Sequence, residues 1–231
     1  MKTIRNIAIV AAAGMGTRFG SELPKQFLPL GDKPMVVHCL ELFERSELMD
    51  EVILVVPEDY LAYASQVVVD QFNFTKIRKI KAGGKTRQES VMAGLSACPT
   101  GIDLVVIHDG DRPFLTDTLL KEVMTRAAID GAAILAVPAR ESIKMAENGF
   151  ISKTMKRDVV WIAQTPQVFR FVDILDAHRR AEAAHHDATD DSELFEQYCG
   201  RVAIIHGCYN NIKITTPGDL ILARAMYKEL K

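Results

Sequence analysis

Glycines and basic residues near the amino terminus are spaced for binding phosphate. Residues 11–18, AAAGMGTR, follow an apolar run, and residues 24–27, PKQF, come shortly after them. Glycine lets backbone N–H groups approach phosphate oxygens with no Cβ in the way. Arg18 and Lys25 would add positive charge beside those amides. We therefore predict a phosphate-binding loop, although a lone G-x-G can also be a plain structural turn.

This loop does not match two other nucleotide-binding motifs. The dinucleotide fingerprint G-x-G-x-x-G fails because Phe19 stands where its third glycine should be. The strand expected at 52–56 is also followed by Pro57, where an adenosine binder would place an acidic ribose ligand. The Walker pattern fails because no G-K-[ST] follows. A non-catalytic or NAD-type nucleotide-binding protein of the Rossmann kind is a remote alternative.

A second chemical cluster is the segment HDGDRP at 108–113, directly after an apolar run. Asp109 would end a strand and face the same crevice as the glycine loop. One carboxylate together with triphosphate oxygens is a common way to hold Mg²⁺. The alternative is a helix cap or a structural pair between Asp109 and Arg112. We expect Asp111 to pair with Arg112 or to cap a turn rather than to bind metal.

The segment GGKTRQES at 83–90 has two equally supported interpretations. Thr86 and Glu89 fit a capping box, so the segment would simply begin a helix. Alternatively, the glycine turn and its neighbours line a nucleobase or ribose.

Three further sites have simple structural interpretations. Lys213, between two isoleucines, would project from one face of a strand and could be only a surface lysine. Residues 189–191 would cap a helix, and Trp161 would anchor a core or an interface.

The elements that must position these residues alternate along the chain. Apolar runs predict strands at 7–13, 52–56, 77–80, 104–107, 132–137 and 202–206. Amphipathic stretches predict helices at 35–43, 60–72, 87–97, 119–128, 172–183, 190–198 and 217–227, the first with Pro34 at its first position. Such alternation favours an α/β fold with a Rossmann-like, doubly wound, mostly parallel sheet. We expect one domain over residues 1–231.

The alternation is interrupted between Pro138 and Pro166. Residues 140–157 are rich in charge and contain Asn148-Gly149, a strong hairpin-turn signal. We predict strands at 142–145 and 151–155, forming a protruding hairpin arm. So small a hairpin is not stable alone, so we expect it to lean on a second subunit.

The overall composition excludes several functional classes. Of 231 residues, 28 are Lys or Arg and 30 are Asp or Glu, which gives a net charge of −2. This balance argues against nucleic-acid or anionic-membrane binding. The amino-terminal apolar run is too short for a signal peptide or membrane span. Four cysteines without a C-x-x-C pair fit reduced thiols, so we expect a cytoplasmic protein.

Taken together, these motifs resemble a known family. Residues 12–18 followed by 24–26 are similar to the nucleotidyltransferases that activate sugar and polyol phosphates. Motifs at 83–90, 108–113, 161–167, 189–190 and 211–215 narrow the resemblance to the 2-C-methyl-D-erythritol 4-phosphate cytidylyltransferases of non-mevalonate isoprenoid biosynthesis. They fall in the family's order over nearly the whole chain. The resemblance implies a fold of the nucleotide-diphospho-sugar transferase type.

The resemblance also implies a reaction and a set of site residues. CMP would pass from CTP to 2-C-methyl-D-erythritol 4-phosphate, releasing pyrophosphate, with Mg²⁺ held by Asp109. Implied catalytic residues are Arg18, Lys25, Lys213 and Arg157. Implied nucleotide contacts are Ala12, Ala13, Gly14, Gly16, Gly84, Lys85, Ser90, Asp109 and Gly110. Implied acceptor contacts are Asp109, Arg112, Ser142, Arg157, Thr165, Thr189 and Lys213.

In that family the arm comes from the partner subunit, so the resemblance implies a homodimer through residues 139–159. The nearest relative by motif is ribitol-5-phosphate cytidylyltransferase, which is the alternative function. Arg157, four residues before Trp161, resembles the methylerythritol branch. Glu141-Ser142 stands where that branch commonly has Asp-Thr, and Gly110-Asp111 where it commonly has small residues.

Overall fold

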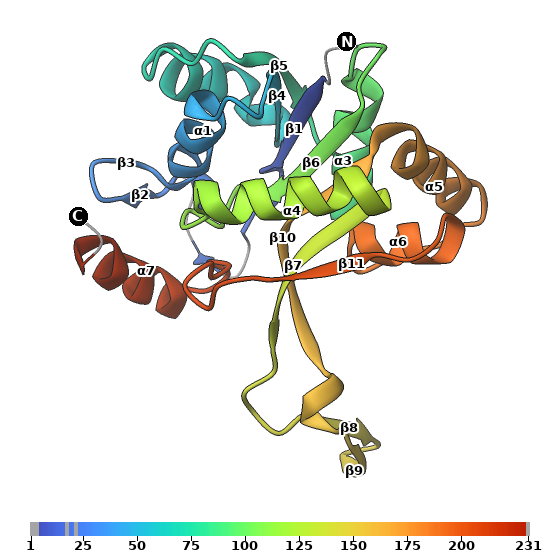
Figure 1. The fold of residues 1–231 in the computed structure, drawn as a ribbon. Helices are drawn as coiled ribbons and strands as arrows, with labels where there is room; N and C mark the ends of the chain where they lie inside the picture. Colours follow the sequence, from blue (N-terminus) through green and yellow to red (C-terminus); the bar gives the residue numbers. More distant parts are fainter. Residues whose placement is uncertain (1–4, 17–18, 21–22, 230–231) are drawn as a thin grey trace.

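The computed structural model describes residues 5–16, 19–20 and 23–229. Its centre is a seven-stranded sheet in the order β11-β7-β10-β6-β1-β4-β5 (Figure 1). Its strands are β1 (Asn6–Ala11), β4 (Glu51–Val56), β5 (Ile77–Ala82), β6 (Leu104–Asp109), β7 (Ala132–Pro138), β10 (Trp161–Arg170) and β11 (Ala203–His206). All neighbours pair in parallel except around β10, which runs antiparallel to both β6 and β7. The predicted α/β, mostly parallel sheet is confirmed.

The central position of β10 was not predicted from the sequence. Pro166 lies inside this strand, and a proline has no N–H to donate to a neighbouring strand. The sequence pattern therefore predicts a break in the alternation here and not a central strand. The pairing of β10 with β7 shifts register between Ala163 and Gln167, which accommodates the proline at an irregularity. Residues 164–169 are buried, as a central strand requires.

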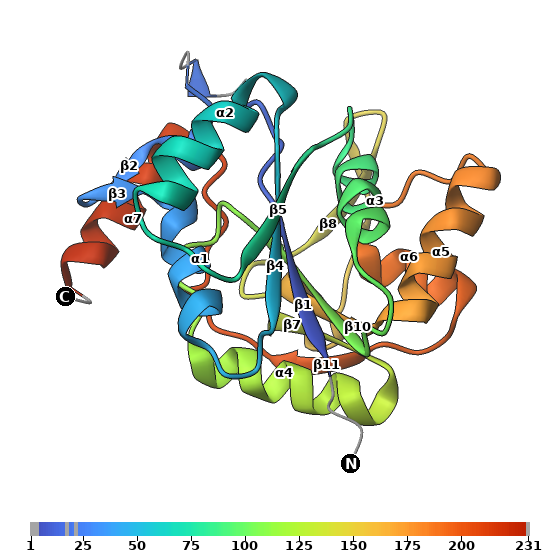
Figure 2. The same cartoon turned by 90° about the horizontal axis from the view of Figure 1, so that it is seen from above.

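Helices cover both faces of the sheet, because side chains of a strand alternate between two sides. Ala8 and Val10 belong to one buried cluster, whereas Ile7 and Ile9 belong to the other. Figure 2 shows α1 and α2 on one side of the sheet and α3, α5 and α6 on the other. The longer helices are α1 (Met35–Arg45), α3 (Arg87–Ala97), α4 (Asp117–Asp130), α5 (Phe171–Ala183), α6 (Asp191–Tyr198) and α7 (Pro217–Glu229).

Two helix details differ from expectation. Pro34 is the residue before α1 and not its first helical position. The helix expected at 60–72 is three short pieces: a 3-10 turn Glu58–Tyr60, α2 (Leu61–Tyr63) and a π-helical segment Ala64–Asp70. None of the helices among the described residues has the length and apolar character needed to cross a bilayer.

The third buried cluster joins the two ends of the chain. A 3-10 turn Lys25–Phe27 leads into a small sheet of β2 (Pro29–Leu30) and β3 (Lys33–Pro34). Leu30 packs in one cluster with Ile214 and Leu220. Helix α7 and the loop before it therefore lie against the segment that carries Lys25.

Chain order places the glycine loop beside Asp109. From β1 the chain passes to β4 and β5, then returns to add β6 on the other side of β1. In this pairing Ala11, the last residue of β1, lies opposite Asp109, the last residue of β6. Open α/β sheets bind ligands at such a switch point, outside the carboxyl ends of the strands.

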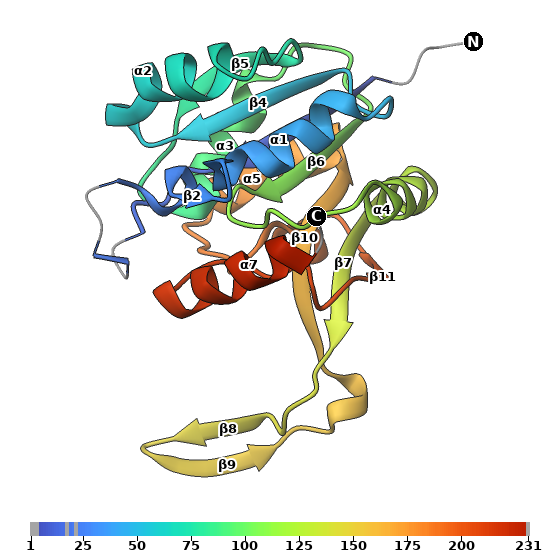
Figure 3. The ribbon, with the colours of Figure 1, turned by 90° about the vertical axis from the view of Figure 1, so that its left-hand side faces the viewer.

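The predicted hairpin is present and protrudes from the body (Figures 1 and 3). Strands β8 (Lys144–Glu147) and β9 (Phe150–Thr154) pair around Asn148-Gly149, and every residue of both is exposed. A 3-10 turn Arg157–Val159 leads from the arm into β10. Trp161, at the base of the arm, is 38% exposed and so is not a core residue.

Candidate active site

A cavity of about 420 Å³ opens at the carboxyl ends of β1 and β6. Its walls come from the glycine loop, the start of α3, the loop after β6 and the loop before α7. The lining residues are Ala11, Ala12, Ala13, Gly14, Met15, Lys25, Gln26, Gly84, Lys85, Thr86, Arg87, Ser90, Asp109, Asp111, Lys213 and Thr215. Most residues implied for the nucleotide therefore share one cavity.

Close packing fixes the backbone of the glycine loop. The N–H of Ala12 donates to the carbonyl of Val55 over 2.8 Å, and the Gln26 amide donates to the carbonyl of Ala12. A Cβ on Gly110 would lie 2.8 Å from the Cβ of Ala12, so Gly110 supports the loop from behind and does not line the cavity. Gly16, at φ +64°, packs against Lys25.

The capping interpretation of residues 83–90 is confirmed, and the same turn lines the cavity. The Thr86 hydroxyl accepts from the N–H of Glu89 over 3.1 Å, so Thr86 caps α3. The Glu89 carboxylate accepts from the N–H of Lys85 over 2.6 Å, and the Ser90 hydroxyl accepts from the N–H of Gly84 over 3.1 Å. These contacts hold the turn against the cavity that Gly84, Lys85 and Ser90 line.

Asp109 is a buried carboxylate surrounded by cations. Arg87 donates to Oδ1 over 3.0 Å, and Lys213 donates to Oδ2 over 2.9 Å. Arg112 lies 3.4 Å from Oδ2. Burial alone would raise the pKa of Asp109, but these charges, led by Arg87 and Lys213, hold it well below its usual range. Asp109 is therefore ionised at neutral pH.

Asp111 does not pair with Arg112, contrary to expectation. Its carboxylate forms an ion pair with the ammonium of Lys25, which also donates to the carbonyl of Ile214 over 3.0 Å. Arg112 turns instead toward Asp109 and the carbonyl of Asn211. Burial and the nearby charge of Asp109 raise the pKa of Asp111, although Lys213 and Lys25 oppose this.

Lys213 lies in a loop and not on a strand, so its predicted placement was wrong. The loop is fixed on both sides of the lysine. The Asn211 amide donates to the carbonyl of Thr165 over 2.9 Å, and the N–H of Ile214 donates to the carbonyl of Asp111 over 3.0 Å. These two hydrogen bonds fix the loop so that the Lys213 side chain contacts Asp109. Lys213 is therefore part of the site and not simply a surface lysine.

A smaller cavity of about 200 Å³ adjoins the first. It is lined by Arg87, Asp109, Arg112, Ala163, Gln164, Thr165, Gln167, Thr189, Asp190 and Lys213. The five implied acceptor residues of the body are all in this set. The Thr165 hydroxyl accepts from the N–H of Asp109 over 3.0 Å, which ties β10 to β6 at this point. Arg87, Asp109 and Lys213 line both cavities.

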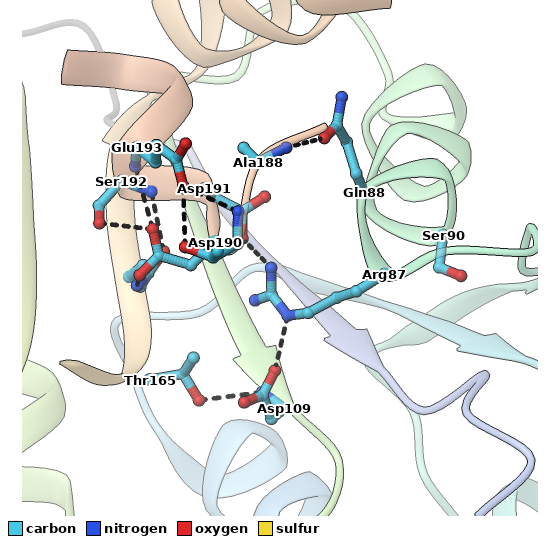
Figure 4. A network of polar contacts seen from close by, with 12 residues as sticks. Arg87, Gln88, Ser90, Asp109, Thr165, Ala188, Asp190, Asp191, Ser192 and Glu193 are labelled. Atoms are coloured by element: carbon cyan, nitrogen blue, oxygen red, sulfur yellow. Dashed lines mark hydrogen bonds and ion pairs between the residues drawn. The ribbon is translucent and has the colours of Figure 1, made fainter. Parts of the chain in front are cut away.

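Sequence reasoning gave no role to Arg87, which the structure makes central (Figure 4). Its guanidinium joins Asp109 to Asp191, with a 2.7 Å contact to the second carboxylate. Asp191 in turn lies 3.0 Å from the buried His178. Asp190 caps α6, as predicted for this segment, by accepting from the N–H of Glu193. Arg87 and Asp191 are far apart in sequence, so no local pattern indicates their pairing.

Two implied site residues in the described part of the chain are not assembled with the others. Arg18 lies outside the described residues. Ser142 and Arg157 belong to the arm, and Arg157 donates to the carbonyl of Arg140 within the same arm. Neither lines either cavity. Among the described residues, no group of three or more His, Cys, Asp or Glu side chains converges as a metal site.

Comparisons with known proteins find one family that matches nearly the whole chain. The model of one family, 2-C-methyl-D-erythritol 4-phosphate cytidylyltransferase, matches residues 6–229. Among relatives with that name, a protein of Syntrophotalea carbinolica is 46% identical over 218 residues, 94% of each chain. One of Geobacter metallireducens is 43% identical over 225 residues, 96% of this chain and 97% of its own.

Solved structures point the same way. A 4-diphosphocytidyl-2C-methyl-D-erythritol synthase of Anaerococcus prevotii superposes with a TM-score of 0.86 at 31% identity, covering 97% of this chain and 96% of its own. A 2-C-methyl-D-erythritol 4-phosphate cytidylyltransferase of Thermus thermophilus gives a TM-score of 0.76 at 28% identity, covering 96% and 98%. The likeness therefore extends over the whole fold.

Proposed function

We propose the activity of this chain from one premise: it belongs to the 2-C-methyl-D-erythritol 4-phosphate cytidylyltransferase family. It is a cytidylyltransferase that moves CMP from CTP to 2-C-methyl-D-erythritol 4-phosphate. The products are 4-diphosphocytidyl-2-C-methyl-D-erythritol and pyrophosphate, in non-mevalonate isoprenoid biosynthesis.

One observation supports this function most directly. Most residues implied for the nucleotide line one cavity, those of the body implied for the acceptor line the next, and both cavities share Asp109 and Lys213. A transfer between two phosphates needs the donor and acceptor side by side, with positive charge where they meet.

The reaction needs no strong base. An oxygen of the acceptor's phosphate attacks the α-phosphorus of CTP, one P–O bond forms, and the bond to pyrophosphate breaks. The attacking phosphate monoester is already anionic near neutral pH. Catalysis then rests on in-line positioning and on charge stabilisation.

The chain's cations supply that stabilisation in our proposal. Lys25, together with Arg18, would stabilise charge on the α-phosphate and on the leaving pyrophosphate. Lys213, between the two cavities, would neutralise the α-phosphate or the incoming phosphate. The amides of residues 13–16 would cradle the triphosphate, because the N–H of Ala12 already donates to the carbonyl of Val55. Gly84, Lys85 and Ser90 would contact cytosine and ribose.

The residues present fit a divalent cation. Mg²⁺ takes oxygen ligands and is commonly held by one carboxylate together with substrate phosphates and water. Asp109 lines the cavity and is ionised at neutral pH, since adjacent cations depress its pKa. When bound, Mg²⁺ would act there as a Lewis acid toward the phosphate oxygens.

We also propose a homodimer in which the arm, residues 139–159, completes the partner's acceptor site. Arm residues Phe150, Ile151 and Val159 are 79%, 64% and 70% exposed, which is unusual for large apolar side chains with no partner surface. Ser142 and Arg157 would reach the acceptor from this arm.

We propose a cytoplasmic location from the state of the cysteines. All four, Cys39, Cys98, Cys199 and Cys208, are free thiols, which supports this location.

The test is pyrophosphate release with CTP and Mg²⁺, using methylerythritol phosphate and ribitol 5-phosphate in parallel. We expect release with methylerythritol phosphate alone. Release with ribitol 5-phosphate alone would keep the CTP site and overturn the acceptor. CTP binding without release in either reaction would overturn both acceptors.

A further inference from the structure

Asp111 places a negative charge where the proposed reaction needs positive charge. Both Asp111 and Lys25 line the larger cavity, and their side chains are only 9% and 12% exposed. A carboxylate at this place repels the oxygens of a bound triphosphate. Its other oxygen, Oδ1, is buried and has no hydrogen-bond partner among the described residues. A buried group that is unsatisfied and opposes the ligand needs an explanation.

Several hydrogen bonds hold the ion pair between Asp111 and Lys25 in place. The ammonium is held between the Asp111 carboxylate and the carbonyl of Ile214. The Ile214 N–H donates back to the carbonyl of Asp111 over 3.0 Å, and the N–H of Gly110 donates to the carbonyl of Ala11 over 2.9 Å. Asp111 is therefore fixed to both the glycine loop and the loop of Lys213.

Among the described residues, the two acidic side chains of the cavity, those of Asp109 and Asp111, have different partners. Asp109 is shared by Arg87, Arg112 and Lys213. Asp111 has Lys25 as its ion-pair partner in the described chain. The cation in direct contact with this carboxylate is therefore the lysine assigned to the leaving pyrophosphate.

We propose that Asp111 is a positioning residue that holds Lys25 before CTP binds and competes with pyrophosphate for the same ammonium after transfer. The proposal rests on the proposed function for the role of Lys25. A lysine held in place requires less reorganisation when charge develops on the leaving group. A carboxylate that competes for it weakens product binding and so favours release.

The variant Asp111→Asn tests this, because it removes the charge and keeps the shape. We expect kcat to fall about tenfold, since Lys25 loses its fixed orientation and pyrophosphate leaves more slowly. We expect KM for CTP and the Kd for pyrophosphate to fall as well, also by about tenfold, since the cavity gains net positive charge. A merely structural defect would raise both constants.

The matched control is Asp130→Asn, which removes one negative charge at the far end of α4, where Asp130 pairs with Arg126. It should leave kcat and both constants unchanged. Asp111→Ala serves as a second variant, and thermal melting checks the fold of each. In a Lys25→Met background, Asp111→Asn should lower kcat no further, because its effect acts through Lys25.

Pyrophosphate binding, measured by calorimetry without CTP or acceptor, separates this proposal from the proposed function. Unchanged or weaker pyrophosphate binding in folded Asp111→Asn and Asp111→Ala overturns the positioning role, as does an equal loss of kcat in the Lys25→Met background. If the wild-type chain releases no pyrophosphate from CTP with either acceptor, the proposed function is overturned. Tighter pyrophosphate binding by Asp111→Asn would still support the competition for Lys25.

Discussion

Lys213 donates a hydrogen bond to Oδ2 of Asp109 over 2.9 Å, although 104 residues separate them in the chain. The contact joins the loop before α7 to the end of β6, and it lies where the two cavities meet. It also neutralises part of the charge of a buried carboxylate. In the proposed reaction, this lysine would transfer its hydrogen bond from Asp109 to a phosphate oxygen.

The first prediction concerns the cations assigned to the proposed reaction. We expect Arg18→Ala, Lys25→Ala and Lys213→Ala each to reduce transition-state stabilisation by about 3 kcal/mol or more, the scale of one lost electrostatic donor. The measurement is kcat/KM for CTP at saturating acceptor. Lys121→Ala, on the exposed face of α4, is the control and should be neutral. Near-normal turnover in any of the three would remove that residue from the mechanism.

The second prediction concerns the close approach of Gly83 to the glycine loop. A Cβ at this position would lie 2.2 Å from the Cβ of Ala13 and 2.7 Å from the hydroxyl oxygen of Ser90. Gly83→Ala must therefore displace one wall of the cavity, and we expect a loss of about 1–3 kcal/mol in the free energy of unfolding. CTP affinity should fall as well. Gly218→Ala, whose Cβ would meet only an ordinary 3.7 Å contact, should do neither.

The third prediction concerns Asp191, which is 1% exposed and pairs with Arg87 over 2.7 Å. Burial alone would raise its pKa, but Arg87 and His178 lower it, so it carries a charge at neutral pH. Asp191→Asn would leave the Arg87 charge without one partner, at a cost of about 3 kcal/mol in the free energy of unfolding. Urea unfolding measures this. The exposed Asp187→Asn would serve as the control, and equal stability of both variants would contradict the expectation.

Which features the sequence could reveal depends on the range of the interactions. The glycine loop, the cap at Thr86 and the hairpin at Asn148-Gly149 rest on local rules, and the structure has all three. The adjacency of Asp109 to the loop follows from chain order in parallel sheets, so it too was predictable.

The remaining features depend on contacts between distant segments. Strand β10 pairs antiparallel with both of its neighbours near the middle of the sheet. Its internal proline argues against a central strand, so the sequence pattern does not predict it. Arg87 meets Asp191, and Lys25 meets Asp111, only after folding. Among these four residues the resemblance gave a site role to Lys25 alone, and it could not assign their partners, because a motif gives residue types and not contacts.

The fourth prediction concerns His108, which is fully buried below the site. Its Nε2 lies 3.1 Å from the carbonyl of Arg112, and its Nδ1 lies 3.1 Å from the Thr165 hydroxyl. Burial lowers its pKa from 6.5 to about 4. Between these values the unfolded chain binds a proton that the folded chain does not. The contribution of neutral His108 to the free energy of unfolding is therefore fully present above pH 6.5, and it is lost as the pH falls toward 4.

The expected loss from this residue is about 2 kcal/mol between pH 7 and pH 5. Urea unfolding of the wild type and of His108→Gln over this range measures it. Glutamine keeps an amide donor for the carbonyl of Arg112 and does not titrate. The free energy of unfolding of the variant should therefore fall less over this pH range than that of the wild type, by that amount. Parallel pH dependences of the two proteins would show that His108 is not the group responsible.

The last prediction tests whether the arm acts on the partner's site. Lys25→Ala disables the body of a subunit, and Arg157→Ala disables its arm. If the arm of one subunit completes the site of the other, a mixed dimer contains one site with both defects and one intact site. Random mixing of equal amounts makes half of the dimers mixed, so about one quarter of wild-type activity should return. An arm that serves its own subunit gives no recovery.

Subunits must exchange for this result to appear, so the two variants are unfolded together and refolded, with each variant refolded alone as the control. The position of the arm makes the experiment informative. Arg157 lines neither cavity of its own chain, whereas Lys25 lines the larger one. The chain therefore keeps the two groups apart, and only a second copy can bring an arm to the acceptor cavity if the arm stays extended. Recovery near one quarter would establish the shared site, and its absence after refolding would assign Ser142 and Arg157 to another role.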